Sequence, residues 1–257
     1  MVFQRRHSVV LPRPSPAGDR LVMVHVEQLE RRALLSAAVA DVSLDEGTLQ
    51  IIGTNKADVI SVSLKDEANI QVTLNGDVQE FALVDVQLIN IKSLQGADNV
   101  AISEDITIST HIVTGQGRDS VLGGGGSDDV DGEMGKDWIN GRAGNDTLRG
   151  RQGPDTIIGG EGDDFIVGGQ GKDSLGGAMG NDTVIGGIEE DTLKGGLGDD
   201  TLDGGDGEDS LSGGAGADHY KDTDNDPDSI GRDGEDALTG DKGDDGVLDE
   251  TPSDLLA

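Results

Sequence analysis

The chain has 257 residues and a formal net charge of −32, and only 33% of its residues are hydrophobic and 2% aromatic. Such a composition excludes a large conventional hydrophobic core, and the acidic charge argues against nucleic acid or an anionic membrane as a partner. Cysteine is absent and no run of 18 apolar residues exists, so we expect no disulfides, no thiolate metal sites and no membrane span.

Residues 1–40 differ in charge from the rest, because they hold six arginines and three acidic residues, a net charge of +3. An apolar run that follows Arg31 and Arg32 ends in Ala38-Val39-Ala40, which is typical of a signal-peptide cleavage site. The segment Leu29–Ser36 also resembles the LEPR-XLL motif, a short element near the N-terminus of bacterial surface proteins. We therefore predict an N-terminal export or targeting segment; the alternative is a small amphipathic helix without a targeting role.

Residues 41–113 alternate between apolar and polar side chains, which predicts short β-strands. The predicted strands are 60–64, 70–74, 88–91 and 106–108, with a turn signal at Asn75-Gly76. Two fragments, Gly53–Ile60 and Gly96–Val100, echo the repeat that follows. We predict a degenerate β region of irregular coils or hairpins that caps a repeat domain; a separate small β-sandwich is the alternative.

Residues 114–221 consist of twelve nine-residue units laid end to end, with the pattern G-G-x-G-x-D-x-U-x, in which U is apolar. Position one is glycine in all units but the first, and position four is glycine in all but one, where Glu189 stands instead. Position six is aspartate in every unit: Asp119, Asp128, Asp137, Asp146, Asp155, Asp164, Asp173, Asp182, Asp191, Asp200, Asp209 and Asp218. Position eight is apolar or aromatic throughout, from Val121 to Tyr220, and this aliphatic position is not expected of a disordered Gly/Asp-rich spacer.

One unit predicts one turn and one strand. Glycine allows the positive φ angles of a tight turn, so we expect the first six residues to form the turn. The last three, such as Thr147-Leu148-Arg149, are expected to form a strand whose middle side chain points inward. A single unit cannot bury its apolar residue, whereas stacked units bury a continuous column. The sequence therefore predicts an all-β fold, a right-handed parallel β-roll of about six 18-residue coils preceded by irregular β coils.

Stacking also brings the aspartates together. Units n and n+2 lie one strand spacing apart, roughly 4.8 Å, so their carboxylates form columns along both edges. Like charges at that distance repel by about 3.5 kcal/mol at an effective dielectric of 20. A cation between the coils is therefore required. Carboxylate and carbonyl oxygens select Ca²⁺ over zinc or copper, and Mg²⁺ fits less well because it gives up its water reluctantly.

On these residues, 114–221 resembles the RTX, or haemolysin-type, calcium-binding nonapeptide repeats. The resemblance implies a parallel β-roll that holds several Ca²⁺ ions between successive turns. It also implies that the twelve position-six aspartates and the turn carbonyls are the metal ligands. The sequence departs from the family pattern at Glu189 and at the second glycine, which is replaced by Glu133, Arg142, Arg151 and Ala178.

Residues 222–257 lose the nine-residue register but stay acidic. Asp222-Thr223-Asp224-Asn225-Asp226 begins like an EF-hand loop, but Pro227 stands where that loop needs glycine. We predict an acidic tail that either binds calcium loosely or is disordered. Enzyme signatures are absent from the whole sequence, including H-E-x-x-H and G-x-S-x-G, and we expect no catalytic residues.

Two functional hypotheses follow. The first is a calcium-binding structural or interaction protein, secreted or on the cell surface, whose repeats fold on binding Ca²⁺ and whose partners are cell-surface glycans or other surface proteins. The second is an accessory polysaccharide-binding module of the RTX type without its catalytic domain. Sugar platforms usually need exposed aromatic side chains, and the repeats offer only Trp138, Phe165 and Tyr220, which favours the first hypothesis.

Overall fold

The computed structural model describes residues 40–222, 229–232, 237–240 and 248–249. Almost all regular structure in this part of the chain is β, apart from the short 3₁₀ helix η1 (Leu83–Asp85). The predicted export segment and the EF-hand-like stretch after Asp222 lie outside the described residues. The boundaries of the predicted domains stay predictions.

The described strands form two sheets. The first sheet contains, in spatial order, β1 (Asp41–Asp45), β2 (Thr48–Ile52), β6 (Leu88–Lys92), β8 (Thr110–Val113), β11 (Asp128–Asp131), β14 (Thr147–Gln152), β16 (Phe165–Gln170), β18 (Thr183–Ile188), β20 (Thr201–Asp206), β22 (His219–Asp222) and β24 (Ala237–Gly240), with the short strands β9 (Gln116–Gly117) and β12 (Met134–Gly135) beside this path. The second contains β25 (Leu248–Asp249), β23 (Ser229–Arg232), β21 (Ser210–Ala215), β19 (Thr192–Leu197), β17 (Ser174–Met179), β15 (Thr156–Glu161), β13 (Trp138–Ala143), β10 (Ser120–Leu122), β7 (Asn99–Ile102), β3 (Val59–Asp66), β4 (Asn69–Leu74) and β5 (Asp77–Ala82).

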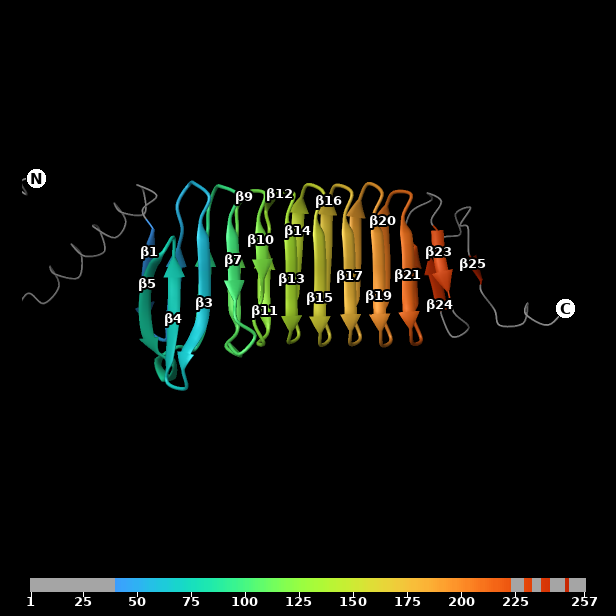
Figure 1. The fold of residues 1–257 in the computed structure, drawn as a ribbon. Helices are drawn as coiled ribbons and strands as arrows, with labels where there is room; N and C mark the ends of the chain where they lie inside the picture. The colour runs from blue at the N-terminus through green and yellow to red at the C-terminus, as the bar shows by residue number, and fades with distance from the viewer. Residues whose placement is uncertain (1–39, 223–228, 233–236, 241–247, 250–257) are drawn as a thin grey trace, which may run out of the picture. The chain divides into compact units, whose positions relative to one another are not determined.

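Consecutive nonapeptides alternate between the two sheets, so each coil of two units spans 18 residues (Figure 1). The pairing is parallel and keeps every unit in register, as in Leu148 opposite Ile166 and Ile157 opposite Leu175. The predicted all-β parallel roll is thus confirmed. It has about seven turns rather than six, because coils have already formed before the first repeat.

The strands are longer than predicted. In the regular coils they span six residues, as in β14, and include the first three positions of the next unit. Arg151 and Gln152, at positions two and three, pair with Gly169 and Gln170 of the next coil. Only positions four to six then form the turn. The three-residue prediction was wrong because the glycines at positions one and two continue the parallel ladder instead of leaving it.

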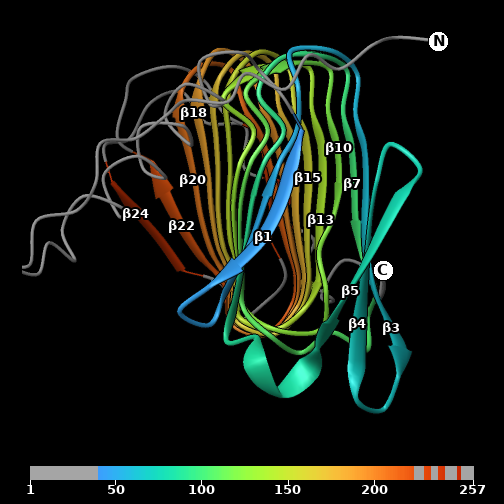
Figure 2. The ribbon, with the colours of Figure 1, turned by 90° about the vertical axis from the view of Figure 1, so that its left-hand side faces the viewer.

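Residues 41–113 supply strands to the same two sheets. Strand β8 pairs in parallel with β11, and β7 pairs in parallel with β10, so both sheets run on into the repeats. Antiparallel hairpins, β1–β2 and β3–β4–β5, lie at the N-terminal end of these sheets (Figure 2). Asn75 and Gly76 form the β4–β5 turn with positive φ angles, as expected from that sequence.

One strand predicted in this region does not form. Residues 106–108 make no ladder, because the Ile106 amide donates to Ser103 O in a local turn. The strand lies further along the chain, at β8. Ile106 is nevertheless buried. Its apolar side chain therefore indicated a buried position correctly but did not indicate a strand.

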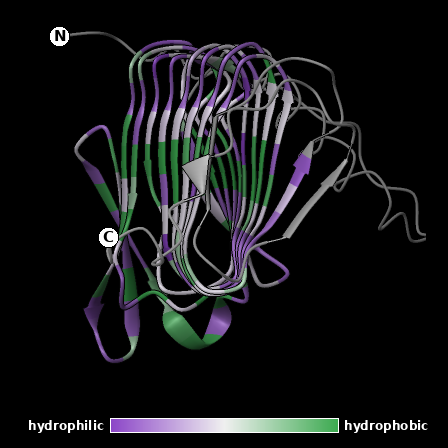
Figure 3. Cartoon of the chain, turned by 90° about the vertical axis from the view of Figure 1, so that its right-hand side faces the viewer, coloured by the Kyte–Doolittle hydropathy of each residue, from purple (hydrophilic) through white to green (hydrophobic). Residues whose placement is uncertain are grey.

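The core of the repeats is one column of position-eight side chains. All twelve are at most 2% exposed, from Val121 to Tyr220. Their neighbours on each strand face outward, as the two-residue period of a strand requires. Figure 3 shows the hydrophobic residues along the strands and hydrophilic residues in the turns that join them. The repeats therefore bury one large apolar side chain per nine residues.

Candidate metal centre

All twelve position-six aspartates are buried, each at most 3% exposed. They follow the strand order of the two sheets and so form one column per roll edge. One column contains Asp119, Asp137, Asp155, Asp173, Asp191 and Asp209, and the other contains Asp128, Asp146, Asp164, Asp182, Asp200 and Asp218. The structure thus brings together all the metal ligands predicted from the sequence, and it orders them by coil.

One oxygen of each repeat carboxylate after the first in its column has a backbone partner. The amide of Asp146 donates to Asp164 Oδ1 at 2.8 Å, and the amide of Asp164 donates to Asp182 Oδ1 at 2.9 Å. The same bond joins the other neighbours in both columns at 2.7–2.9 Å. These bonds fix the orientation of the carboxylates, because each aspartate side chain is held by the main chain of the preceding coil.

The second oxygen is not satisfied by the protein. Within the described residues, nine column aspartates of the repeats have a buried Oδ2 atom without a hydrogen-bond partner: Asp119, Asp137, Asp146, Asp155, Asp164, Asp173, Asp182, Asp191 and Asp200. A buried polar atom without a partner costs about 1–3 kcal/mol, and more if it is charged. A repeated defect of this kind indicates that each oxygen has a ligand outside the chain.

Burial also raises the pKa of these carboxyls. Desolvation is the largest cause, and it raises the pKa of Asp155 to about 6, that of Asp164 to about 7 and that of Asp191 to about 8. The neighbouring charges of Asp173 and Asp209 add to the rise at Asp191. Without a counter-charge, these carboxylates are therefore held in an environment that opposes their ionised form.

Backbone carbonyls converge on the same points. A Cβ atom on Gly159, at position one, would lie 2.1 Å from Asp164 Oδ2 and 2.8 Å from Gly177 O of the next coil. Gly141 and Gly168 have the same surroundings, with the corresponding aspartate and the next position-one carbonyl. Only glycine fits at position one of these units, because these two oxygen atoms approach its backbone closely. Both oxygens are hydrogen-bond acceptors, and neither is a donor.

No three acidic or histidine side chains meet at one point in the described part of the chain. A metal ion here would therefore have to take its ligands from carboxylates of the columns together with turn carbonyls. Hard oxygen donors in a flexible backbone turn suit Ca²⁺, which accepts six to eight such ligands. The residues present fit calcium, and the aspartate columns would hold it.

Two buried aspartates ahead of the repeats, Asp58 and Asp98, extend one column, and neither was predicted as a member of it. Asp98 is 2% exposed, its amide donates to Asp119 Oδ1, and its own Oδ1 accepts from the Asp58 amide, both at 2.8 Å. Residues 93–101 thus form a repeat unit that departs from the consensus sequence and precedes the first regular unit. The fragment Gly96-Ala97-Asp98 was the available signal. The unit is hard to recognise in the sequence because Ser93 and Leu94 replace its first two glycines.

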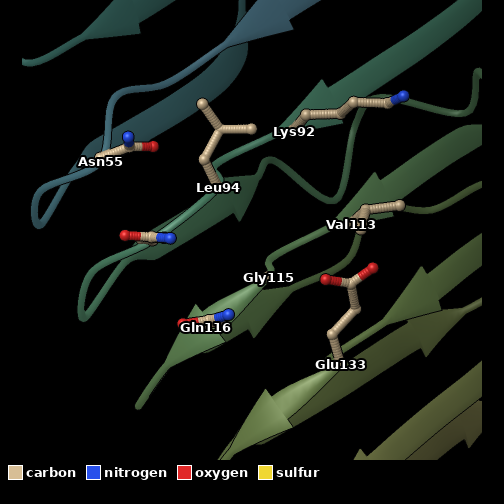
Figure 4. A pocket seen from close by; sticks show the side chains of 8 residues that line it. Asn55, Lys92, Leu94, Val113, Gly115, Gln116 and Glu133 are labelled. Carbon is tan, nitrogen blue, oxygen red and sulfur yellow. The ribbon is translucent and has the colours of Figure 1, made fainter. Parts of the chain in front are cut away.

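The turn around Leu94 has the conformation of the repeats despite its sequence. Leu94, Gly115 and Glu133 all occupy position two, with φ angles of 81°, 98° and 62°. Figure 4 shows these three residues in the successive turns that line an open hollow of about 460 Å³. The charged side chains among the residues that line it are Lys92 and Glu133.

The aromatic side chains of the repeats do not gather. Trp138 lies on β13 and Phe165 on β16, which belong to different sheets. Both are about two-fifths exposed, at 37% and 40%. Tyr220 is fully buried, and its hydroxyl oxygen accepts from the Gly213 amide at 2.6 Å. Among the described residues, the repeats therefore present no joint aromatic platform.

Comparisons with known proteins agree with this geometry. The RTX calcium-binding nonapeptide repeat family matches in four copies, over residues 110–139, 133–157, 149–184 and 185–220. No curated protein matches the chain. The repeats of this family bind Ca²⁺ and are structural rather than catalytic. Residues 110–220, with their buried aspartate columns, belong to the RTX calcium-binding nonapeptide repeat family.

Proposed function

We propose that the protein is a calcium-binding structural or interaction protein of the cell exterior, whose repeats fold when the aspartate columns bind Ca²⁺. The observation that carries this proposal is the set of nine buried Oδ2 atoms of the repeat aspartates without a partner in the described chain. In the absence of a cation these atoms oppose folding. When each is bound to Ca²⁺, the same atoms stabilise the stacked coils.

The coupling between binding and folding follows from linkage. A ligand that binds only the folded state stabilises it by about 2.7 kcal/mol per site at one hundred times its dissociation constant. Several sites along the roll multiply this effect. The apolar column supplies only one large side chain per nine residues, about 1.5–3 kcal/mol each, against the cost of ordering those residues. Calcium therefore decides whether the repeats are folded.

This dependence supports a role outside the cell. Calcium is scarce in the cytosol, so the repeats would stay unfolded there and would fold after export. Within the residues that the structure describes, no helix is long and apolar enough to cross a membrane. The proposal gives the protein no enzymatic activity and assigns the twelve aspartates 119 to 218 as its calcium ligands.

A polysaccharide-binding role is the alternative. The separation of Trp138 and Phe165 onto different sheets argues against it, because sugar rings stack on neighbouring aromatic side chains. A glycan-array screen in the presence of calcium distinguishes the two roles. Specific binding to a polysaccharide would favour the module, and binding to surface proteins alone would favour the interaction role.

Circular dichroism of the full chain tests the proposal directly. In chelator we expect little β signal from the repeats, and millimolar Ca²⁺ should induce it. The same concentration of Mg²⁺ is the control and should induce much less, because Mg²⁺ keeps its own water shell. A β spectrum that chelator leaves unchanged would contradict the proposal.

A further inference from the structure

The N-terminal coils differ from the rest in what occupies the space beside the position-one carbonyls. In the regular repeats no side-chain donor stands in this space, because position one is glycine and the aspartate Oδ2 atom packs closely against it, as at Gly159. In the first coils, side-chain donors fill it. The Ser93 hydroxyl donates to Thr114 O at 2.9 Å, and the Thr114 hydroxyl donates to Gly132 O at 3.0 Å. Each hydroxyl thus bonds a position-one carbonyl, the kind of carbonyl that elsewhere in the roll lies near the unpartnered aspartate oxygens.

At the other edge a guanidinium does the same. Arg142 Nη1 donates to Gly123 O at 3.2 Å and to Ile102 O at 2.7 Å. Arg142 stands at position two with φ 79°, a conformation that glycine adopts more easily. An arginine in a strained backbone conformation therefore stands where the family pattern has glycine. Its positively charged guanidinium contacts two backbone carbonyl oxygens.

The first aspartates of both columns are likewise satisfied by the protein. Asp58 accepts from the Thr54 amide at 2.6 Å and from Asn75 Nδ2 at 2.5 Å. Asp128 accepts from the Thr110 hydroxyl at 2.7 Å and from the Gly124 amide at 2.8 Å. Both oxygens of each carboxylate thus have donors within the chain.

Between these ends and the regular repeats lie Asp98 and Asp119. The hydroxyls of Ser93 and Thr114 lie beside them and lower the pKa of each carboxyl, against the larger rise that burial causes. Asp98 and Asp119 each keep a buried Oδ2 atom without a hydrogen-bond partner among the described residues, as the following aspartates do. They differ in having a hydroxyl residue at position one of their unit, whereas every later unit has glycine there.

The core is also denser at this end. Of the buried hydrophobic side chains in the described chain, fourteen lie within residues 49–112 and twelve are spread over residues 121–220. The N-terminal region also contains the antiparallel hairpins, whose contacts are local in sequence and form early in folding. This end therefore has the burial and the internal hydrogen bonds that a metal-free fold requires.

We propose that residues 41–132 fold without calcium and serve as the template on which the calcium-bound coils add, starting from Asp137 and Asp146. This inference rests on the proposed function and deepens it, since it assigns where calcium dependence begins. Side-chain donors replace the cation in the first coils. The edge strands β10 and β11 then offer a formed ladder to each following coil, so the roll grows from its N-terminal end.

Hydrogen–deuterium exchange of the full chain, in chelator and in Ca²⁺, tests this. In chelator we expect amides of 41–113 to be protected and those of 146–218 to exchange freely, and Ca²⁺ should protect the second set. Free exchange of 41–113 in chelator, with calcium-dependent protection of both regions, would overturn the template while leaving the proposed function intact. Calcium-independent exchange at 146–218 would instead overturn the proposed function.

Variants that remove single donors test the mechanism. Ser93→Ala and Thr114→Val each remove a hydroxyl donor to a position-one carbonyl, and Ser120→Ala, on the outward face of β10, is the matched control. In chelator we expect the first two to speed exchange within 41–132 by about three- to tenfold, from the loss of one buried hydrogen bond. The control should leave it unchanged. Rates equal to the parent in both donor variants, with the roll still formed in Ca²⁺, would show that these donors do not stabilise a metal-free template.

Discussion

The amide of Asp146 donates to the Oδ1 atom of Asp164, one coil further along the chain, at 2.8 Å. Asp164 Oδ2 is buried and finds no partner among the described residues. One carboxylate thus performs two tasks. Its first oxygen sets the distance between coils, and its second oxygen is held in a fixed position for a cation.

Because the Asp164 carboxylate has both tasks, we expect a substitution of Asp164 to affect calcium-dependent folding far more than a substitution of Asp163. Asp164→Asn keeps an oxygen for the Asp146 amide but removes the charge that would bind Ca²⁺. Asp163→Asn changes an exposed side chain whose Oδ1 accepts from the Asn181 amide at 2.8 Å, a bond that asparagine can also accept. We expect the first variant to raise the calcium midpoint of folding and the second to leave it nearly unchanged. A calcium titration followed by circular dichroism measures both midpoints, and equal shifts would show that the nine-residue register is assigned wrongly.

The raised pKa values predict that acid partly replaces calcium. In the metal-free roll, burial raises the pKa of Asp137, Asp146 and Asp173 to about 7, above the ordinary value of 3.8. The folded state therefore binds protons more tightly than the unfolded chain does. Its stability is greatest below the unfolded pKa and is lost as the pH rises through about 7. In chelator we expect the β signal to increase as the pH falls from about 8 to about 5.5.

The control for this titration is the same pH series in saturating Ca²⁺. Bound calcium holds the carboxylates ionised, so the β signal should there be constant or should decrease towards low pH as protons compete with the metal. A metal-free chain that loses β structure on acidification would contradict the buried position of the carboxyls.

The fold was predictable because the nine-residue pattern sets both the strand and the stacking. The apolar residue at position eight of each nine-residue unit must point inward to be buried. Burial of all these residues together requires the units to stack as parallel coils. The aspartate columns follow from the same register. The length of the strands was not predictable in this way, because Gly150 and Arg151 show no alternation of apolar and polar side chains that would indicate a strand. Only the observed pairing of Arg151 with Gly169 shows that the strand continues through them.

The N-terminal coils were harder to predict because their turns are built from different residues. Leu94 takes the position-two conformation of a glycine at φ 81°, and Asp98 takes the position of a repeat aspartate. The spacing from Asp98 to Asp119 is also 21 residues instead of 18. Tertiary stacking on the next coil imposes the conformation there, so the local sequence does not reveal it.

The buried Tyr220 is the position-eight residue of the last of the twelve repeats, and it differs from its aliphatic neighbours in having a polar group. Its hydroxyl oxygen accepts from the Gly213 amide at 2.6 Å. Tyr220→Phe removes the acceptor and leaves a buried amide unsatisfied, which should destabilise the calcium-bound roll by about 1–3 kcal/mol. Thermal unfolding in Ca²⁺ measures the loss. Phe165→Leu, on the exposed face of β16, is the control and should change stability by no more than about 0.5 kcal/mol. Equal melting temperatures for Tyr220→Phe and the parent would show that this hydrogen bond adds nothing.

Glu189 is the one repeat residue that replaces a position-four glycine, and it has a φ angle of 80°. This conformation costs a non-glycine residue about 1 kcal/mol or more. The charge of Glu189 also raises the pKa of Asp173 and Asp191, after the larger effect of burial. We expect Glu189→Gly to raise the melting temperature of the calcium-bound form and the calcium affinity of the neighbouring sites, by about 1 kcal/mol, since glycine also loosens the unfolded chain.

Two variants separate strain from charge at this turn. Ala178→Gly relieves a similar φ angle of 90° without a change of charge, and Glu189→Gln removes the charge but keeps the strain. If strain dominates, the two glycine variants should gain stability alike and Glu189→Gln should gain little. Calcium affinity measured by isothermal titration decides the remaining question. Weaker binding in both Glu189 variants, with no loss in Ala178→Gly, would show that the Glu189 carboxylate is itself a calcium ligand, and the strain at this turn would then be the cost of that extra oxygen.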